Sequence, residues 1–109
     1  MEINFDNVSS SDQINIRTQN STYNFEVLDP DERRGILSGG TLGNHGREAV
    51  LISSLDGDGG EGTKASPVLK PGTRALFYMT AKRGFERLIT SVITGISHLN
   101  NEGDHRRAA

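Results

Sequence analysis

The stretch FERLITSVITGISHL, residues 85–99, decides the fold class of this chain. Its apolar side chains recur at the three- and four-residue spacing of one helical face. Its composition favours a strand, because six of the eight residues from Ile89 to Ile96 are β-branched and Gly95 interrupts the run. Branched side chains lose rotamer freedom in a helix and fit a pleated strand. We therefore expect strand and an all-β fold, with an α+β fold carrying a C-terminal helix at 85–99 as the alternative.

The chain before this stretch shows the pattern of short strands separated by turns. Apolar and polar residues alternate, or apolar residues run together, in five segments. These segments are 13–18, 23–28, 34–38, 48–53 and 75–80. Breakers such as Gly39-Gly40 separate them, and Ala81-Lys82-Arg83-Gly84 has the late glycine of a tight hairpin connection. The sequence predicts a small antiparallel β-barrel or sandwich of about six strands, since closure removes aggregation-prone edges.

Length and composition predict a single domain with loose ends. A chain of 109 residues is the size of one domain. We expect a single β domain at 13–99, a mobile N-terminal lead-in at 1–12 and a flexible C-terminal tail at 100–109. The chain has no cysteine, which excludes disulfides and thiolate metal sites. No basic region followed by an apolar stretch opens the sequence, and no apolar run has membrane length, so we expect a cytoplasmic protein.

The small net charge hides an uneven distribution along the chain. Residues 1–63 contain four basic and eleven acidic residues, a net of −7. Residues 64–101 contain six basic residues against one acid, a net of +5. Such a split suggests an electrostatic partner, of which the simplest is another copy of the chain.

The glycine-rich stretch SSLDGDGGEGTKASP, residues 53–67, admits three interpretations. A phosphate-binding P-loop requires lysine where Thr63 stands, and it must open a helix that Pro67 prevents. An EF-hand loop requires more oxygen ligands than this stretch offers, although a sparse cation site is conceivable. That candidate metal site consists of Asp56, Asp58 and Glu61. We expect instead a flexible connection between two strands, with no cofactor.

Catalytic patterns are missing from the sequence. There is no cysteine nucleophile and no serine in a G-x-S-x-G elbow. His45, His98 and His105 have no carboxylate partner at a recognisable spacing. We therefore expect a protein that is not an enzyme.

A basic hairpin is the best candidate for a binding site. The candidate residues are Arg74, Tyr78, Lys82, Arg83 and Arg87. Small barrels bind single-stranded nucleic acid by stacking bases on aromatic side chains beside a cationic groove. A simpler interpretation is that Phe77 lies in the core, Tyr78 faces the other side and the cations keep the hairpin soluble. The acidic pI of about 5.9 also differs from the basic character usual for nucleic-acid binders.

Three short segments resemble small uncharacterised bacterial all-β proteins. The segments are Arg17-Thr18-Gln19-Asn20-Ser21-Thr22-Tyr23, Gly35-Ile36-Leu37-Ser38-Gly39-Gly40 and Thr90-Ser91-Val92-Ile93. They are similar to an R-T-x-N-S-x-Y-like strand near the start and a T-S-x-V-like strand near the end of those proteins. The resemblance covers about residues 13–97. It implies a β fold and a strand at 85–97, and it implies no activity and no site residues.

Together these features predict a binding protein. We expect a non-catalytic interaction module that self-associates as a homo-oligomer or binds a protein partner. The alternative is a nucleic-acid-binding barrel that uses the basic hairpin at 74–87.

Overall fold

The computed structural model describes residues 2–57 and 60–100, which fold mainly as β-strands. The eight strands are β1 (Gln13–Thr18), β2 (Thr22–Asp29), β3 (Arg34–Gly39), β4 (Arg47–Asp56), β5 (Lys64–Ser66), β6 (Arg74–Thr80), β7 (Phe85–Ile89) and β8 (Ile93–Leu99). Two single-turn 3-10 helices, η1 (Phe5–Asn7) and η2 (Gly40–Leu42), accompany them. The predicted all-β fold is confirmed, with eight strands in place of about six. No helix in the described ranges has the length and apolar character of a membrane span.

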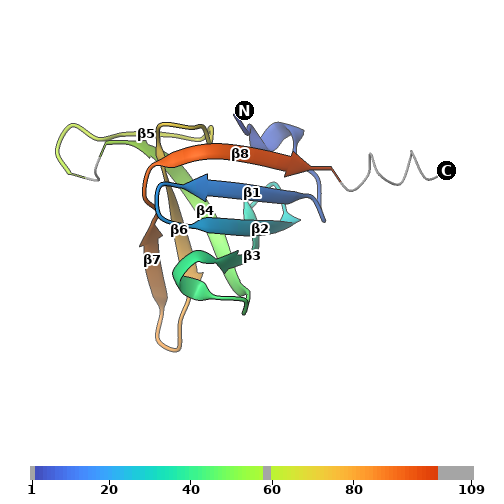
Figure 1. Ribbon diagram of the computed structural model, residues 1–109. Helices are drawn as coiled ribbons and strands as arrows, with labels where there is room; N and C mark the ends of the chain where they lie inside the picture. Colours follow the sequence, from blue (N-terminus) through green and yellow to red (C-terminus); the bar gives the residue numbers. More distant parts are fainter. Residues whose placement is uncertain (1, 58–59, 101–109) are drawn as a thin grey trace.

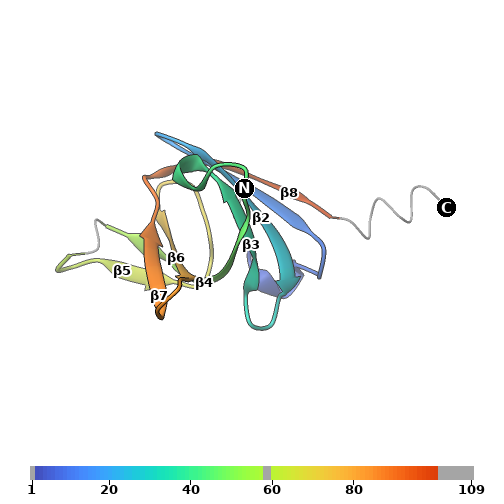
Figure 2. The same cartoon turned by 90° about the horizontal axis from the view of Figure 1, so that it is seen from below.

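The strands form one antiparallel sheet in the order β7-β6-β4-β3-β2-β1-β8, with β5 paired to β4 beside this path. The sheet bends so strongly that β1, β2 and β8 cross over β4 and β6 (Figures 1 and 2). It does not close into a barrel, because β7 and β8 end the order without pairing to each other. The start of β8 is tied instead to residues before β6: Gly72 N–H donates to Ile93 O (2.9 Å), and Ile93 N–H donates to Thr73 O (2.7 Å).

The core lies between the two halves of the bent sheet. Strands β1 and β2 bury every second side chain, as the alternation predicts. The buried hydrophobic side chains of these strands are Ile14, Ile16, Tyr23, Phe25 and Val27. The ring of Phe25 on β2 lies 5.3 Å, centroid to centroid, from the ring of Phe77 on β6. The two halves therefore meet face to face through aromatic side chains, which bury the largest apolar areas.

Residues 85–99 form two strands rather than one strand or a helix. Strand β7 pairs with β6 and β8 pairs with β1, so residues 90–92 cross from one edge of the sheet to the other. The alternative of a C-terminal helix is therefore wrong. The spacing that resembles a helical face instead distributes the apolar side chains over both faces of the sheet. Ile93 and Ile96 are buried, whereas Phe85 is 71% exposed.

The segment expected as a mobile lead-in contributes to the core. Ile3, Phe5 and Val8 are all buried. Ile3 and Leu69 exchange backbone hydrogen bonds of 2.7 and 2.9 Å. The sequence pattern does not predict this burial, because three apolar side chains among polar ones show neither the helical nor the strand period.

Two other predicted segments extend beyond the described residues. Strands β4 and β5 form a hairpin across the glycine-rich stretch, with Asp56 opposite Lys64. The prediction that this stretch joins two strands is confirmed. Residues 58–59 within it, and 101–109 of the predicted tail, lie outside the described part of the chain.

Candidate binding surface

The β6–β7 hairpin forms where the sequence predicts it. Ala81 N–H donates to Gly84 O at 3.0 Å and closes the turn. Gly84 has a φ of +79°, a left-handed conformation that glycine adopts without a Cβ penalty. The turn therefore projects Lys82 and Arg83 into solvent.

The pairing of the two strands brings aromatic and basic side chains together on the outer side of the sheet. Tyr78 lies opposite Arg87, and Thr80 lies opposite Phe85. Because Phe77 points into the core and neighbouring side chains alternate, Tyr78 points outward and is 41% exposed. We call this outer side of the hairpin the hairpin face. It comprises Arg74, Tyr78, Lys82, Arg83, Phe85 and Arg87.

Apolar side chains extend this face across β4. Tyr78 on β6 has Arg87 of β7 as its cross-strand neighbour on one side. On the other side its neighbour is Val50 of β4, which is half-buried. Five large hydrophobic side chains in the described ranges are exposed, and three of them, Ile52, Tyr78 and Phe85, lie on this side of the sheet. Clustered exposed apolar groups mark contact surfaces more often than scattered ones do.

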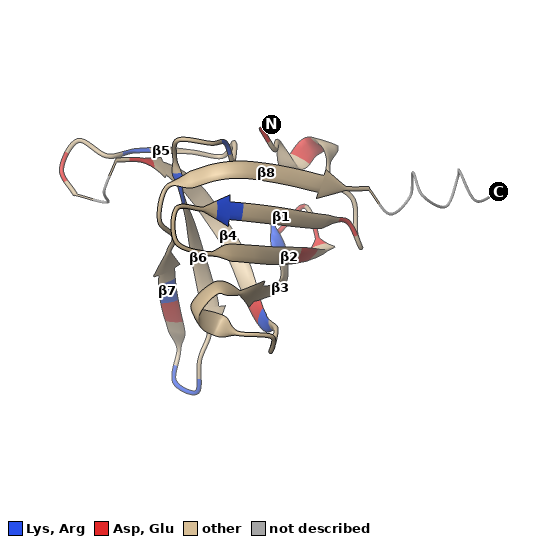
Figure 3. Ribbon diagram, in the orientation of Figure 1, with Lys and Arg blue, Asp and Glu red and all other residues tan. Residues whose placement is uncertain are grey.

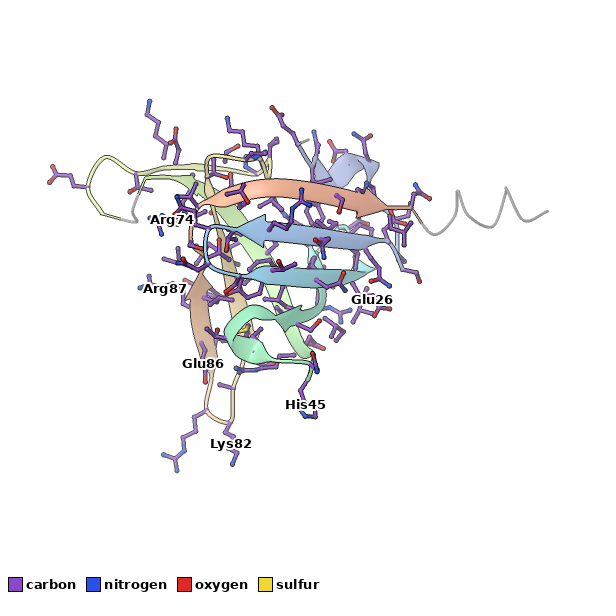
Figure 4. The ribbon with its side chains drawn as sticks, in the orientation of Figure 1. Glu26, His45, Arg74, Lys82, Glu86 and Arg87 are labelled. Atoms are coloured by element: carbon purple, nitrogen blue, oxygen red, sulfur yellow. The ribbon has the colours of Figure 1, made fainter. Side chains whose placement is uncertain are left out.

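The cations of the hairpin face are not neutralised by nearby acids. Glu86 pairs instead with Arg47, at 3.1 Å between Oε2 and Nη1. Arg74 donates from Nη1 to Thr90 O at 3.4 Å. Within the described residues, no acidic side chain lies within ion-pair distance of a cation of the hairpin face. Figure 4 shows Arg74 and Arg87 pointing to the same side of the molecule, with Lys82 at the tip.

All five residues predicted from the sequence therefore lie on one hairpin. Tyr78 and Arg87 are direct cross-strand neighbours. Arg74 is at the far end of β6, on the same face as Tyr78 because the two are four residues apart along the strand. Lys82 and Arg83 occupy the turn between the strands. The five residues are therefore spread along both strands and the turn of one hairpin.

The candidate cation site of Asp56, Asp58 and Glu61 stays a prediction. Asp58 lies outside the described residues, and Asp56 stands opposite Lys64. The described residues contain no group of three or more His, Cys, Asp or Glu side chains arranged to hold a metal ion.

The structure reveals an Asp–His pair that the sequence analysis missed. The Nε2 atom of His98 lies 2.8 Å from Oδ2 of Asp12, and Asp12 is fully buried. The two residues are 86 positions apart and meet only because β8 pairs with β1. No local pattern links them, so spacing along the chain offered no signal. The pair ties the segment before β1 to the edge strand β8.

Arg33 and a neighbouring cavity form a second unexpected feature. Arg33 adopts a left-handed backbone (φ +57°), and its guanidinium lies 4.8 Å from the centroid of the Phe5 ring. Its Nη2 donates to Pro67 O at 2.8 Å, while its buried Nε has no hydrogen-bond partner within the described structure. Burial lowers the pKa of this guanidinium. The cavity has a volume of about 550 Å³ and is lined by Asn4, Phe5, Asp6, Val8, Pro30, Asp31, Arg33, Pro67 and Val68.

Comparisons with known proteins show no relative of this chain: no protein-family model, no curated protein and no solved structure matches it. The resemblance to small bacterial all-β proteins stays a prediction.

Proposed function

We propose that this protein is a non-catalytic binding module that contacts a protein partner, most simply a second copy of itself, through the hairpin face. One observation carries the proposal: Phe85 and Tyr78 are 71% and 41% exposed beside Arg87. Protein interfaces are enriched in aromatic residues and arginine, and these residue types supply most binding hot spots. The cytoplasmic location predicted from the sequence is part of this proposal.

The distribution of charge supports contact between copies. The tip of the β6–β7 hairpin is basic, with Lys82 and Arg83, whereas acidic residues gather at the β2–β3 turn and near η1 (Figure 3). Strand β7 itself contains one cation, Arg87, and one acid, Glu86. Asp29 at the end of β2 and the exposed Asp31 and Glu32 of the turn supply three acids, whereas Arg33 of the same turn is half-buried. The hairpin face of one copy and the acidic turn of another are complementary, and such complementarity favours encounter and orientation.

Sedimentation velocity over a range of protein concentrations tests self-association. We expect the sedimentation coefficient to rise with concentration and to rise less at higher salt, because exposed charges are screened. The double variant Lys82→Glu with Arg83→Glu should weaken association. A matched control, Lys64→Glu with Lys70→Glu, makes the same change in net charge away from the hairpin face and should leave association largely intact. A single monomeric species at every concentration would refute self-association.

A nucleic-acid-binding role is the second candidate, and the neighbouring Tyr78 and Arg87 favour it. Stacking of a base on an aromatic side chain contributes about 1–3 kcal/mol in single-strand binders. Fluorescence anisotropy with labelled random single-stranded and duplex oligonucleotides, at low and near-physiological salt, tests it. Salt-sensitive binding that the Lys82→Glu, Arg83→Glu variant abolishes would favour this role. The absence of binding at low salt would eliminate it.

A further inference from the structure

Strand β7 has one unpaired edge, and the hydrogen bonds of its hairpin show which backbone groups face that edge. Ala81 N–H donates to Gly84 O, and Thr90 N–H donates to Ala75 O. Bonded pairs recur at every second position of an antiparallel ladder. Met79–Glu86 and Phe77–Leu88 are therefore also hydrogen-bonded pairs of the ladder.

The alternate residues of β7 consequently direct their backbone groups away from β6. Phe85, Arg87 and Ile89 each point one N–H and one C=O toward the free edge. The side chains of the same residues lie on the outer side of the sheet, where Arg87 stands beside Tyr78. A strand added to this edge would bond to their backbone and meet these side chains at the same time.

The side chains around this edge define the partner's chemistry. Arg87, Lys82 and Arg83 are exposed cations without an acidic partner in the part of the chain that the structure describes. Two β7 strands paired edge to edge would bring these like charges together, which disfavours pairing between the β7 strands of two copies. An extended segment with acidic side chains is attracted by the same charges. Its apolar side chains would cover Phe85, which otherwise exposes most of its ring.

The opposite edge of the sheet is less suited to this role. Ile93, at the start of β8, already exchanges backbone hydrogen bonds with Gly72 and Thr73. Strand β8 (Ile93–Leu99) contains no arginine or lysine, and its one ring is that of His98. This ring is hydrogen-bonded to Asp12. The aromatic and cationic groups that select a partner therefore gather at β7.

We propose that β7 receives an extended, acidic segment of a partner protein, which adds to the sheet as a ninth strand. This inference rests on the hairpin face of the proposed function and adds the mode of binding and the partner's chemistry. The arrangement would use backbone hydrogen bonds for affinity and the outward side chains of β7 for selectivity.

A labelled synthetic peptide with the repeat glutamate–threonine–valine–threonine serves as the probe, with binding followed by fluorescence anisotropy at low salt. As an added strand, this peptide presents glutamate and valine in turn on the same face. The variant Ile89→Pro removes one outward N–H while leaving the bonds to β6 in place, since proline is tolerated on edge strands. The matched control Ile89→Ala keeps that N–H and shortens the side chain. We expect Ile89→Pro to weaken binding about tenfold, because a hydrogen bond is lost and the proline ring obstructs the edge. Ile89→Ala should weaken binding by less than about threefold, and the same peptide with lysine in place of glutamate should not bind.

Amide hydrogen exchange of the unmodified protein supplies a measurement that does not depend on a variant folding. Peptide binding should slow exchange at the amides of Phe85, Arg87 and Ile89. Equal binding by Ile89→Pro and Ile89→Ala, with unchanged exchange at these amides, would overturn strand addition. Binding of an oligonucleotide but not of the peptide would overturn it as well. Neither result removes the proposed function if sedimentation still shows association that Lys82→Glu with Arg83→Glu weakens.

Discussion

The contribution of the His98–Asp12 contact to stability can be tested with a single substitution. The Asp12 carboxylate is fully buried, and its Oδ2 accepts hydrogen bonds from His98 Nε2 at 2.8 Å and from the Ser9 backbone N–H at 3.0 Å. The His98 side chain is only 14% exposed. If the ring is removed, water therefore reaches the Asp12 carboxylate poorly and replaces the lost hydrogen bond only in part. We predict that His98→Ala destabilises the protein substantially without altering the hairpin face.

The magnitude follows from two losses. Removing a donor from a buried acceptor costs about 1–3 kcal/mol. Deleting most of a buried ring adds about 1 kcal/mol of lost burial, at roughly 25 cal/mol per Å². The sum, about 2–4 kcal/mol, is a large part of the roughly 5–15 kcal/mol that holds a domain folded. For a domain of this size, it corresponds to a decrease in Tm of roughly 10–20 °C.

Urea unfolding followed by far-UV circular dichroism measures this effect in a double-mutant cycle of Asp12→Ala and His98→Ala. Residues in direct contact show interaction energies of about 0.5–3 kcal/mol, so we expect the double variant to lose less stability than the sum of the single variants. Ser97→Ala is the control, because its exposed side chain lies next to His98 on β8 and should change stability by less than about 0.5 kcal/mol. Additive effects, or a loss below about 1 kcal/mol for His98→Ala, would refute the proposed contribution of the pair.

Two further predictions concern the β2–β3 turn. The backbone N–H of Glu32 donates to the Asp29 carboxylate and lowers its pKa below the ordinary value of 3.8. Ionised Asp29 therefore stabilises the fold above pH 3.8, and this contribution is lost as the pH falls through the lowered pKa. Asp29→Asn should reduce the decrease in unfolding free energy at acidic pH, and an unchanged decrease would contradict this. Arg33→Gly should relieve about 1 kcal/mol of strain, because glycine adopts the left-handed backbone conformation freely. The same change should cost about 2–3 kcal/mol of stability, because the contact with Phe5 and the hydrogen bond to Pro67 are lost. Thermal unfolding should show a net loss of about 1–2 kcal/mol, and a gain in stability would show that the strain dominates.

Much of the candidate surface could be predicted from local sequence. The placement of Gly84 predicted the hairpin turn, and alternation predicted that Phe77 is buried and Tyr78 exposed, as the structure shows. A turn of known length sets the register, and the register places Arg87 opposite Tyr78. These features depend on residues close together in the chain, so pattern alone was sufficient.

The Asp12–His98 pair and the Arg33 cavity could not be predicted in the same way. Each joins segments that are far apart in the sequence. Asp12 reaches His98 through the pairing of β1 with β8, and Arg33 contacts both the N-terminal segment at Phe5 and the residues after β5 at Pro67. Neither contact has a spacing that a periodicity or a motif could reveal.

The sequence by itself determined the β character of the chain, the position of most strands and the clustering of cations at one hairpin. Those properties follow from rotamer preference, alternation and turn chemistry, which act over a few residues. Only the tertiary structure decided that 85–99 divides at 90–92, where the Thr90 hydroxyl accepts a hydrogen bond from Ala75 N–H at 3.0 Å. It also decided that the sheet stays open, which leaves β7 with a free edge. Those outcomes depend on how strands distant in sequence share one core, and the burial that rewards each pairing exists only when the whole sheet has assembled.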